Sequence, residues 1–465
     1  MNRRTDGKGR SEERRAAIGR ELRALLKLAL PLVGAQAGAQ LMSLVDTAMV
    51  GRLGASSMGG VGIANGLYFA ITLLGAGCVV GMDPLVTQAI GAGEEIRARQ
   101  LLDAGTRVAL LVSIPLALVA VASTLLLEPA GVDPETAREA RRFILARAPN
   151  TLPFLVFFAQ RSYLQARGAT LPLLAAMGLA NLGNFIGNAL LIYGDDALST
   201  VGLPRIGLPA LGVVGSGLSS TIAALVSMAV LGFAIRSLHA DAPPRPPRDA
   251  RLQTAIIRLG LPLGLQWLAE VGVFALVGIL AGRMSAQAAA GHQVALNLAS
   301  MSFTMALGIG SATAVRVGAN VGRGDTEGAR RSGFVGLLAG AGIMSISATA
   351  FLTLPHWLGR MLTNDPSVIA AAAPLIMIAA AFQLSDGTQV VAAGALRGAG
   401  DTRASLLANL VGHYLVGLPV AIALGFGLSL GAPGLWWGLS VGLTAVALGL
   451  TARFSALSKR EIKRV

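Results

Sequence analysis

The chain has 465 residues, of which 54% are hydrophobic and only 13% charged. Soluble globular domains carry about 25% charged residues, so this composition excludes a water-soluble protein and indicates a membrane-embedded one. The formal net charge of +14 does not indicate nucleic-acid binding, because the sequence predicts no face on which basic and aromatic residues alternate. Cys78 is the only cysteine, which excludes a disulfide within the chain.

Long apolar runs recur along the whole sequence. Each is long enough to cross a hydrocarbon core of about 30 Å as a helix. They predict an all-α integral membrane protein with twelve spans. The approximate centres of these spans are Gly38, Leu73, Leu116, Val156, Gly183, Ala223, Glu270, Ser302, Gly342, Ala380, Leu415 and Gly442.

The distribution of Lys and Arg predicts the orientation of the spans. Most of the 38 basic residues fall in the tails and in the even-numbered loops, and cytoplasmic loops carry such an excess. We therefore expect both termini in the cytoplasm. The predicted segments are a cytoplasmic N-terminal tail (1–23), an N-lobe of six spans (24–236), a cytoplasmic Pro-rich linker (237–254), a C-lobe of six spans (255–456) and a cytoplasmic C-terminal tail (457–465).

The two predicted lobes resemble each other in sequence. Leu28–Leu32 in the first span matches Leu259–Leu263 in the seventh, and Leu164–Thr170 after the fourth span matches Ala395–Thr402 after the tenth. Two six-helix repeats of the same orientation predict a pseudo-twofold axis along the membrane normal and a site between the lobes near mid-membrane. This architecture is typical of transporters that work by alternating access.

Glycines spaced four residues apart predict close helix approach, as small residues do in membrane proteins. Such pairs are Gly62 and Gly66, Gly183 and Gly187, Gly336 and Gly340, and Gly434 and Gly438.

Three acidic residues lie inside predicted spans: Asp46, Glu270 and Asp386. A charge within a bilayer costs roughly 2.5 to 3.5 kcal/mol on insertion scales, so such residues usually face a cavity and have a function. We therefore expect them to bind a cation or a proton. The alternative is a structural role, in which neighbouring polar groups satisfy each acid; for Asp46 this partner would be Arg52.

Amide side chains on the fifth span are candidates to support Asp46. Asn184 and Asn188 are four residues apart and share one helix face. They would line a hydrophilic site with Asp46 or, equally, hydrogen-bond one helix to another.

The motifs of other function classes are missing from the sequence. It contains no phosphate-binding Gly-x-x-x-x-Gly-Lys-[Ser/Thr] loop, no Gly-x-Ser-x-Gly nucleophile motif and no metal-ligand spacing among its four histidines. We expect no catalytic residues, no enzymatic activity and no resident cofactor. The energy for transport would then come from an ion gradient.

Several motifs are similar to those of one transporter family. Leu259–Val271, Ala290–Asn297 and Asp386–Thr402 resemble the multidrug and toxic compound extrusion (MATE) family, closest to its NorM branch, and Val45–Gly54 resembles the acid motif of its N-lobe. The resemblance covers nearly the whole chain. It implies a V-shaped antiporter with two lobes that exports amphipathic organic cations as Na+ or H+ returns.

The resemblance also implies roles for individual residues. Glu270 and Asp386 match the cation-binding acids of the C-lobe, with Na+ as a candidate ligand, and Asp46 matches the acid of the N-lobe. Asn184 and Asn188 correspond to polar partners of that acid. Phe382 stands where some Na+-coupled relatives carry Tyr, so the sequence leaves the coupling ion open between Na+ and H+.

The sequence therefore predicts an efflux antiporter for small organic cations in the bacterial inner membrane, surrounded by lipid and monomeric. Aromatic side chains that could stack on a bulky cation are Phe154, Phe158, Trp267 and Phe274. The alternative function is a dedicated exporter or flippase of one endogenous metabolite or lipid-linked precursor, for which an Arg-lined cavity would be expected.

Overall fold

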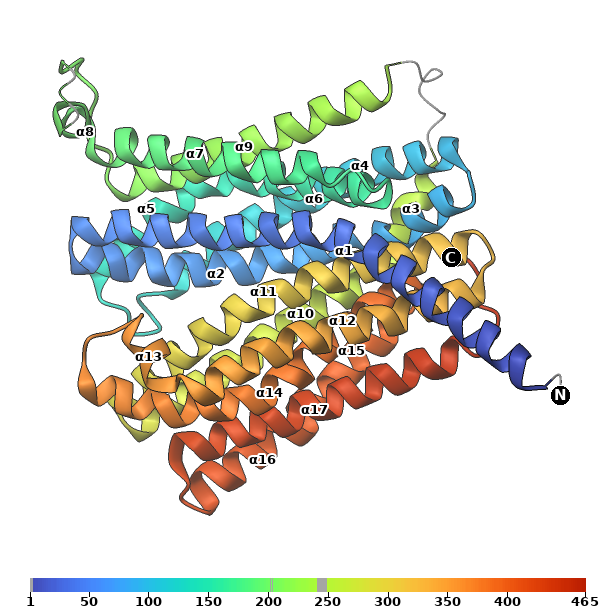
Figure 1. Ribbon diagram of the computed structural model, residues 1–465. Coiled ribbons are helices and arrows are strands. Elements are labelled where there is room, and N and C mark those ends of the chain that lie inside the picture. The colour runs from blue at the N-terminus through green and yellow to red at the C-terminus, as the bar shows by residue number, and fades with distance from the viewer. Residues whose placement is uncertain (1–2, 201, 203, 241–248) are drawn as a thin grey trace. The chain divides into compact units, whose positions relative to one another are not determined.

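A computed structural model of the chain describes residues 3–200, 202, 204–240 and 249–465. These residues form helices and connecting loops, with no strand among them, which confirms the predicted all-α class (Figure 1). Residues 241–248 of the predicted Pro-rich linker lie outside the described residues.

The helices follow one another with short connections. In the first half of the chain they are α1 (Arg3–Val50), α2 (Ala55–Val80), α3 (Met82–Gly91), α4 (Glu95–Ser123), α5 (Pro134–Arg147), α6 (Thr151–Ala166), α7 (Leu171–Tyr193), α8 (Asp195–Thr200) and α9 (Val213–Leu238). In the second half they are α10 (Ala250–Met284), α11 (Ala286–Gly322), α12 (Thr326–Thr353), α13 (Pro355–Arg360), α14 (Pro366–Gly398), α15 (Thr402–Leu410), α16 (Leu418–Ile422) and α17 (Gly431–Leu457). Shorter helical pieces are η1 (Gly51–Leu53), η2 (Thr124–Leu126), η3 (Ala148–Asn150) and the π-helical turns η4 (Val411–Gly417) and η5 (Ala423–Gly427).

The chain forms two compact units, and helices α1, α3 and α10 contribute to both. The first unit comprises Met1–Val33, Asp83–Glu94 and Ala269–Val465, and the second comprises Gly34–Met82 and Glu95–Leu268. The predicted lobes, 24–236 and 255–456, remain a prediction.

Each unit has its own apolar core. In the second unit, α7 and α9 lie side by side, and α2 packs against α5 through buried residues that include Val61, Tyr68 and Phe143. In the first unit, α14 packs against α11, α12 and α17 around Phe382 and Trp436. These cores hold in place the polar side chains described below.

Eleven helical segments of the described residues are long and apolar enough to cross a membrane. The remaining predicted span, the fourth in the chain, is centred near Val156 and is divided into α5 and α6 by the short helix η3. Pro149 lies within η3 and has no N–H to donate to a regular helix. The division leaves Arg147, the last residue of α5, beside the break.

The expected close helix approach at glycine pairs is confirmed for two pairs. A Cβ atom at Gly336 would overlap Thr313, and one at Gly340 would overlap Val391, each on a neighbouring helix. In the second pair, a Cβ atom at Gly434 would overlap Leu424, and one at Gly438 would overlap Ala421, on neighbouring helical segments. The expectation is wrong for Gly62, Gly66 and Gly183, where an added Cβ would meet no atom of the described residues within 4 Å. Gly187 does pack closely, against Ser219. Spacing alone does not say which face of a helix has a neighbour.

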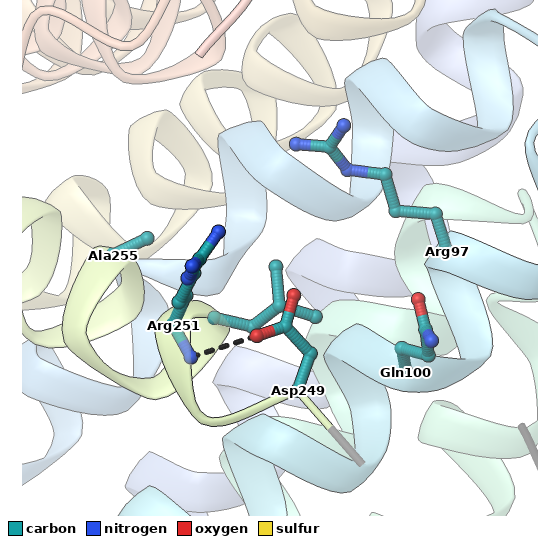
Figure 2. A pocket seen from close by; sticks show the side chains of 6 residues that line it. Arg97, Gln100, Asp249, Arg251 and Ala255 are labelled. Atoms are coloured by element: carbon teal, nitrogen blue, oxygen red, sulfur yellow. Dashed lines mark hydrogen bonds between the residues drawn. The ribbon is translucent and has the colours of Figure 1, made fainter. Parts of the chain in front are cut away.

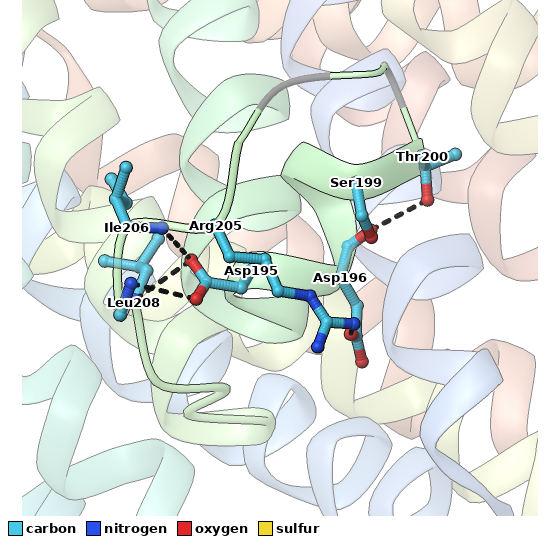
Figure 3. Close-up of polar contacts among 8 residues, drawn as sticks. Asp195, Asp196, Ser199, Thr200, Arg205, Ile206 and Leu208 are labelled. Atoms are coloured by element: carbon cyan, nitrogen blue, oxygen red, sulfur yellow. Dashed lines mark hydrogen bonds and ion pairs between the residues drawn. The ribbon is translucent and has the colours of Figure 1, made fainter.

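The carboxylate of Asp195 accepts hydrogen bonds within the connection between α7 and α9 (Figure 3). The Asp195 side chain accepts hydrogen bonds from the backbone N–H groups of Ile206, Gly207 and Leu208 at 3.1, 2.9 and 3.0 Å. The backbone hydrogen bond from Leu208, with those from the other two residues, holds the pKa of Asp195 below its usual value. The carboxylate therefore holds the start of this connection, at Asp195, against residues 206–208 near its end.

A buried ion pair attaches the early part of α1 to the first unit. Arg316 on α11 donates two hydrogen bonds to the Glu21 carboxylate, at 2.9 and 2.6 Å, and Ser332 on α12 donates a third at 2.6 Å. Bidentate pairing of this kind fixes orientation as well as charge.

Candidate functional site

The first unit brings Glu270 and Asp386 together. Glu270 lies on α10 and Asp386 on α14, in the middle of two of the predicted spans. The Nε2 group of Gln389 donates to Glu270 Oε1 at 2.7 Å and to Asp386 Oδ1 at 3.3 Å. Glu270 and Asp386 are also close enough to repel each other electrostatically. One amide thus joins two carboxylates that the sequence predicts as a pair.

Two residues next to the acid pair, Gln389 and Asn409, carry further oxygen atoms. Gln389 Oε1 is buried and has no hydrogen-bond partner among the described residues, and the same holds for Asn409 Oδ1. Asn409 is fully buried on α15 and lies within interaction distance of the Glu270 carboxylate. Carboxylate and amide oxygens are the ligands that hard cations prefer, so the donor set fits Na+ as well as a proton.

Sequence reasoning identified neither Gln389 nor Asn409 as part of this site. Gln389 follows Asp386 by three residues, a spacing that places both on one helix face. That spacing was the available signal. The spacing identifies Gln389 as a site residue only once Glu270 on α10 is known to lie next to this face of α14.

Aromatic rings lie next to the acid pair. Phe274, one turn after Glu270, meets Phe382 edge-on with ring centroids 6.3 Å apart, and its centroid is 6.4 Å from that of His413. Phe382 also meets Trp436 edge-on at 5.7 Å and is 2% exposed. Phe382 is therefore part of the apolar core one turn before Asp386, and it offers no oxygen to a cation.

The other proposed stacking residues lie in the second unit. Phe154 and Phe158 on α6 pack edge-on against each other, with ring centroids 5.0 Å apart. Trp267 is half-buried on α10. A role for these rings in substrate stacking remains a prediction.

The second unit brings together Asp46, Asn184 and Asn188. Asn188 Nδ2 donates to Asp46 Oδ1 at 2.5 Å and to Asn184 Oδ1 at 3.2 Å, and both asparagines are fully buried. Ser219 on α9 donates to the backbone oxygen of Asn184 at 2.8 Å. The structure thus joins the three residues that the sequence associated. Within the described part of the chain, Arg52 makes no ion pair with Asp46, so the alternative partner is not used.

Arg147 is a further charged group of this cluster that sequence reasoning missed. It interacts electrostatically with Asp46 and donates a hydrogen bond to Asn65 Oδ1 on α2. The sequence placed it nine residues from the centre of a predicted span, near the edge of the hydrocarbon core, where a charge is a weak signal. In the structure it lies three residues before the midpoint of the segment from Pro134 to Ala166, where a charge costs more.

A cavity of about 400 Å³ lies elsewhere in the second unit (Figure 2). Its lining residues come from α4 and from the start of α10. They are Arg97, Gln100, Asp249, Arg251, Leu252 and Ala255. None of the predicted site residues is among them, so this cavity is separate from both acid clusters.

The fold and these sites define a class of protein, an all-α, multi-pass membrane protein with carboxylates buried inside its spans. Comparison with known proteins identifies the family within that class. The MatE family model matches residues 31–190 and 262–423. The chain belongs to the multidrug and toxic compound extrusion (MATE) family, in its NorM branch, and is a membrane transporter by family rather than an enzyme.

Curated relatives cover nearly the whole chain. A probable multidrug resistance protein NorM of Deinococcus radiodurans is 38% identical over 443 residues, covering 93% of this chain and 95% of the relative. The multidrug resistance protein MdtK of Photorhabdus laumondii is 30% identical over 451 residues, covering 95% of this chain and 96% of the relative.

Solved structures show the same fold at lower identity. The eukaryotic MATE transporter AtDTX14 is similar with a TM-score of 0.83 and 20% identity, covering 95% of this chain and 98% of that one. The Vibrio cholerae MATE transporter VcmN in the bent form has a TM-score of 0.84 and 17% identity, covering 96% and 99%. They confirm the predicted MATE fold with its twelve spans.

Proposed function

We propose that this protein is a multidrug efflux antiporter that exports organic cations in exchange for Na+ or H+ by alternating access. The observation that carries the proposal is the acid pair of the first unit, in which Gln389 joins Glu270 and Asp386. The names of the NorM and MdtK relatives support multidrug export. We place the protein in the bacterial inner membrane, with both termini in the cytoplasm.

The acid pair suits exchange for an electrostatic reason. Two like charges repel strongly in a medium of low dielectric constant, and a proton, Na+ or an organic cation would relieve that repulsion. Because each of these cations would satisfy the same charges, binding of one opposes binding of another. Competition of this kind, combined with alternate exposure of the site to the two sides, gives antiport.

The proposal requires no resident cofactor and no second subunit. Glu270, Asp386, Gln389 and Asn409 all belong to one unit of one chain. Lipid is the surrounding solvent, organic cations are the proposed substrates, and Na+ or H+ is the second substrate. We propose a monomer that binds no nucleic acid.

A second candidate function is a dedicated exporter or flippase of one endogenous metabolite or lipid-linked precursor. The observation that favours it is Arg147, a cationic side chain among the buried polar residues of the second unit. An anionic substrate would be attracted to such a group and repelled by the acid pair.

Efflux from liposomes tests the proposal. Purified wild type, Glu270→Gln and Asp386→Asn would be reconstituted, and efflux of a fluorescent organic cation followed under a Na+ gradient or a pH gradient, each imposed alone. We expect one gradient to drive efflux in the wild type and each substitution to lower the rate at least tenfold. Glu128→Gln, which changes an exposed acid outside both clusters, is the control. Failure of both gradients to drive efflux of any organic cation tested would favour the dedicated exporter.

A further inference from the structure

Arg147 lies where a membrane protein has few reasons to place a charge. It ends α5, directly before the η3 break that divides the fourth span. A guanidinium at the depth of a span is costly unless it has partners or a function. The four Arg residues of α5 are not equivalent, because Arg141 and Arg142 pair with the acids Glu128 and Glu139.

The contacts of Arg147 fix its guanidinium in place. One nitrogen donates to Asn65 Oδ1. The guanidinium carbon lies 4.9 Å from the centroid of the Tyr68 ring and 5.4 Å from that of Phe143. Its Nε atom is buried and has no hydrogen-bond partner within the described part of the chain. Stacking between two rings holds the charge without neutralising it.

Helix α9 brings this guanidinium and Asp46 into one cluster. A Cβ atom at Gly217 would lie 3.2 Å from the backbone nitrogen of Arg147, which shows how closely α9 approaches α5 there. Two residues further along α9, Ser219 donates to the backbone oxygen of Asn184 at 2.8 Å, and Asn184 accepts from Asn188, the amide that binds Asp46. The packing of α9 against α5 and α7 thus brings Arg147 near enough to Asp46 for its positive charge to act on the carboxylate.

The two acid clusters therefore differ in charge. Glu270 and Asp386 have each other and amide groups as partners. Asp46 has the amide of Asn188 and the positive charge of Arg147. A positive charge near a carboxylate lowers the free energy gained when another cation binds there.

We infer that Arg147 is an internal counter-cation of Asp46, which makes the second unit bind Na+ or an organic cation less tightly than Asp46 alone would. The inference rests on the proposed function, because it treats Asp46 as a cation site. Arg147 acts on the cation through Asp46 and is a positioning and specificity residue. Transport cations would then occupy the acid pair of the first unit at concentrations that leave Asp46 unoccupied.

Equilibrium binding to a protein without the acid pair tests the inference. In the full chain carrying Glu270→Gln and Asp386→Asn, binding of Na+ and, separately, of tetraphenylphosphonium would be measured by calorimetry at constant pH. Adding Arg147→Gln should raise the affinity for at least one of them about tenfold, as expected for removal of about 1.4 kcal/mol of repulsion. Adding Asp46→Asn to that variant should abolish the gain.

Three further variants separate charge from packing. Arg147→Lys keeps the positive charge and should leave the affinity within twofold of the parent protein. Arg147→Met keeps the apolar stem between the rings and should raise the affinity as Arg147→Gln does, so it replaces that variant if Gln unfolds the protein. Arg142→Gln on the same helix is the matched control and should have no effect.

Either of two results would overturn the inference: an unchanged affinity in both the Gln and Met variants, or a gain that persists without Asp46. Because the acids of the first unit are absent from all these proteins, the outcome does not depend on whether they couple transport to a gradient. Failure of the liposome experiment and failure of this one are therefore distinguishable.

Discussion

At the scale of single residues, Gln389 is the group whose position gives the acid pair its geometry. Its amide donates to both carboxylates, while its own oxygen stays unpaired among the described residues. Hydrogen bonds to charged groups contribute about 1.5 to 3 kcal/mol, so loss of this amide should matter for cation binding as well as for folding.

We predict that Gln389→Leu weakens the affinity for the coupling ion at least tenfold, because the carboxylates lose a shared donor and the site loses an oxygen ligand. The measurement is the Na+ or H+ concentration that gives half-maximal efflux from liposomes. Gln383→Leu is a matched control, because Gln383 is also fully buried on α14 with an unpaired Oε1, yet its amide donates to Ser302. Equal effects of the two substitutions would contradict a specific role for Gln389.

At the scale of elements, the connection between α7 and α9 depends on the ionised form of one side chain. Asp195 holds three backbone N–H groups from the far end of the loop (Figure 3). Its pKa is lowered in the folded protein, first by the backbone hydrogen bond from Leu208, so the ionised form is the one that folding favours. The stabilisation is therefore present above the ordinary Asp pKa of about 3.9 and is lost as the pH falls through the lowered folded value.

We predict that Asp195→Asn speeds amide hydrogen exchange in residues 204–212 at neutral pH, since the variant lacks the charge that these N–H groups bind. Wild type should approach the behaviour of the variant only when the pH falls below about 3.9, at which Asp195 begins to be protonated. Exchange would be followed by mass spectrometry. Asp196→Asn is the comparison, because Asp196 contacts Arg205 and none of these backbone groups through its carboxylate. A similar increase in both variants would argue against the backbone hydrogen bonds as the cause.

At the scale of the whole molecule, the features that could be predicted from the sequence are those that a short stretch of residues indicates by itself. Glu270, Asp386 and Asp46 stand out because each interrupts an apolar run, and the four-residue spacing of Asn184 and Asn188 predicts one shared face. The structure confirms that these residues meet as two groups.

Other features depend on which helices are neighbours, and no local pattern contains that information. Nothing in the sequence distinguishes Gln389, which bridges the acids, from Gln383, which bonds Ser302 on α11. Likewise, the spacing of Gly62 and Gly66 matches that of Gly336 and Gly340, but among the residues that the structure describes only the second pair has a close neighbour. Arg147 was missed because its partners Asn65 and Tyr68 lie on α2, and the sequence does not show that α2 packs against α5.

The division into two units gives a prediction about how the acids act together. Glu270 and Asp386 share a donor within the first unit, whereas Asp46 has its own partners in the second. Residues that act as one group give strongly non-additive effects, while residues without shared partners give nearly additive free energies.

We therefore expect Glu270→Gln and Asp386→Asn together to slow gradient-driven efflux no more than about threefold beyond the worse single substitution. Asp46→Asn should have a smaller effect of its own, because Arg147 already offsets the charge of Asp46, and its effect should multiply with that of Glu270→Gln. Efflux rates in liposomes would be measured for the wild type, the two single variants and the double variant of each pair, which completes a double-mutant cycle for each pair. Multiplicative effects within the Glu270 and Asp386 cycle would mean that the acids bind separate cations, and the shared amide of Gln389 would then be a structural contact rather than part of one coupling site.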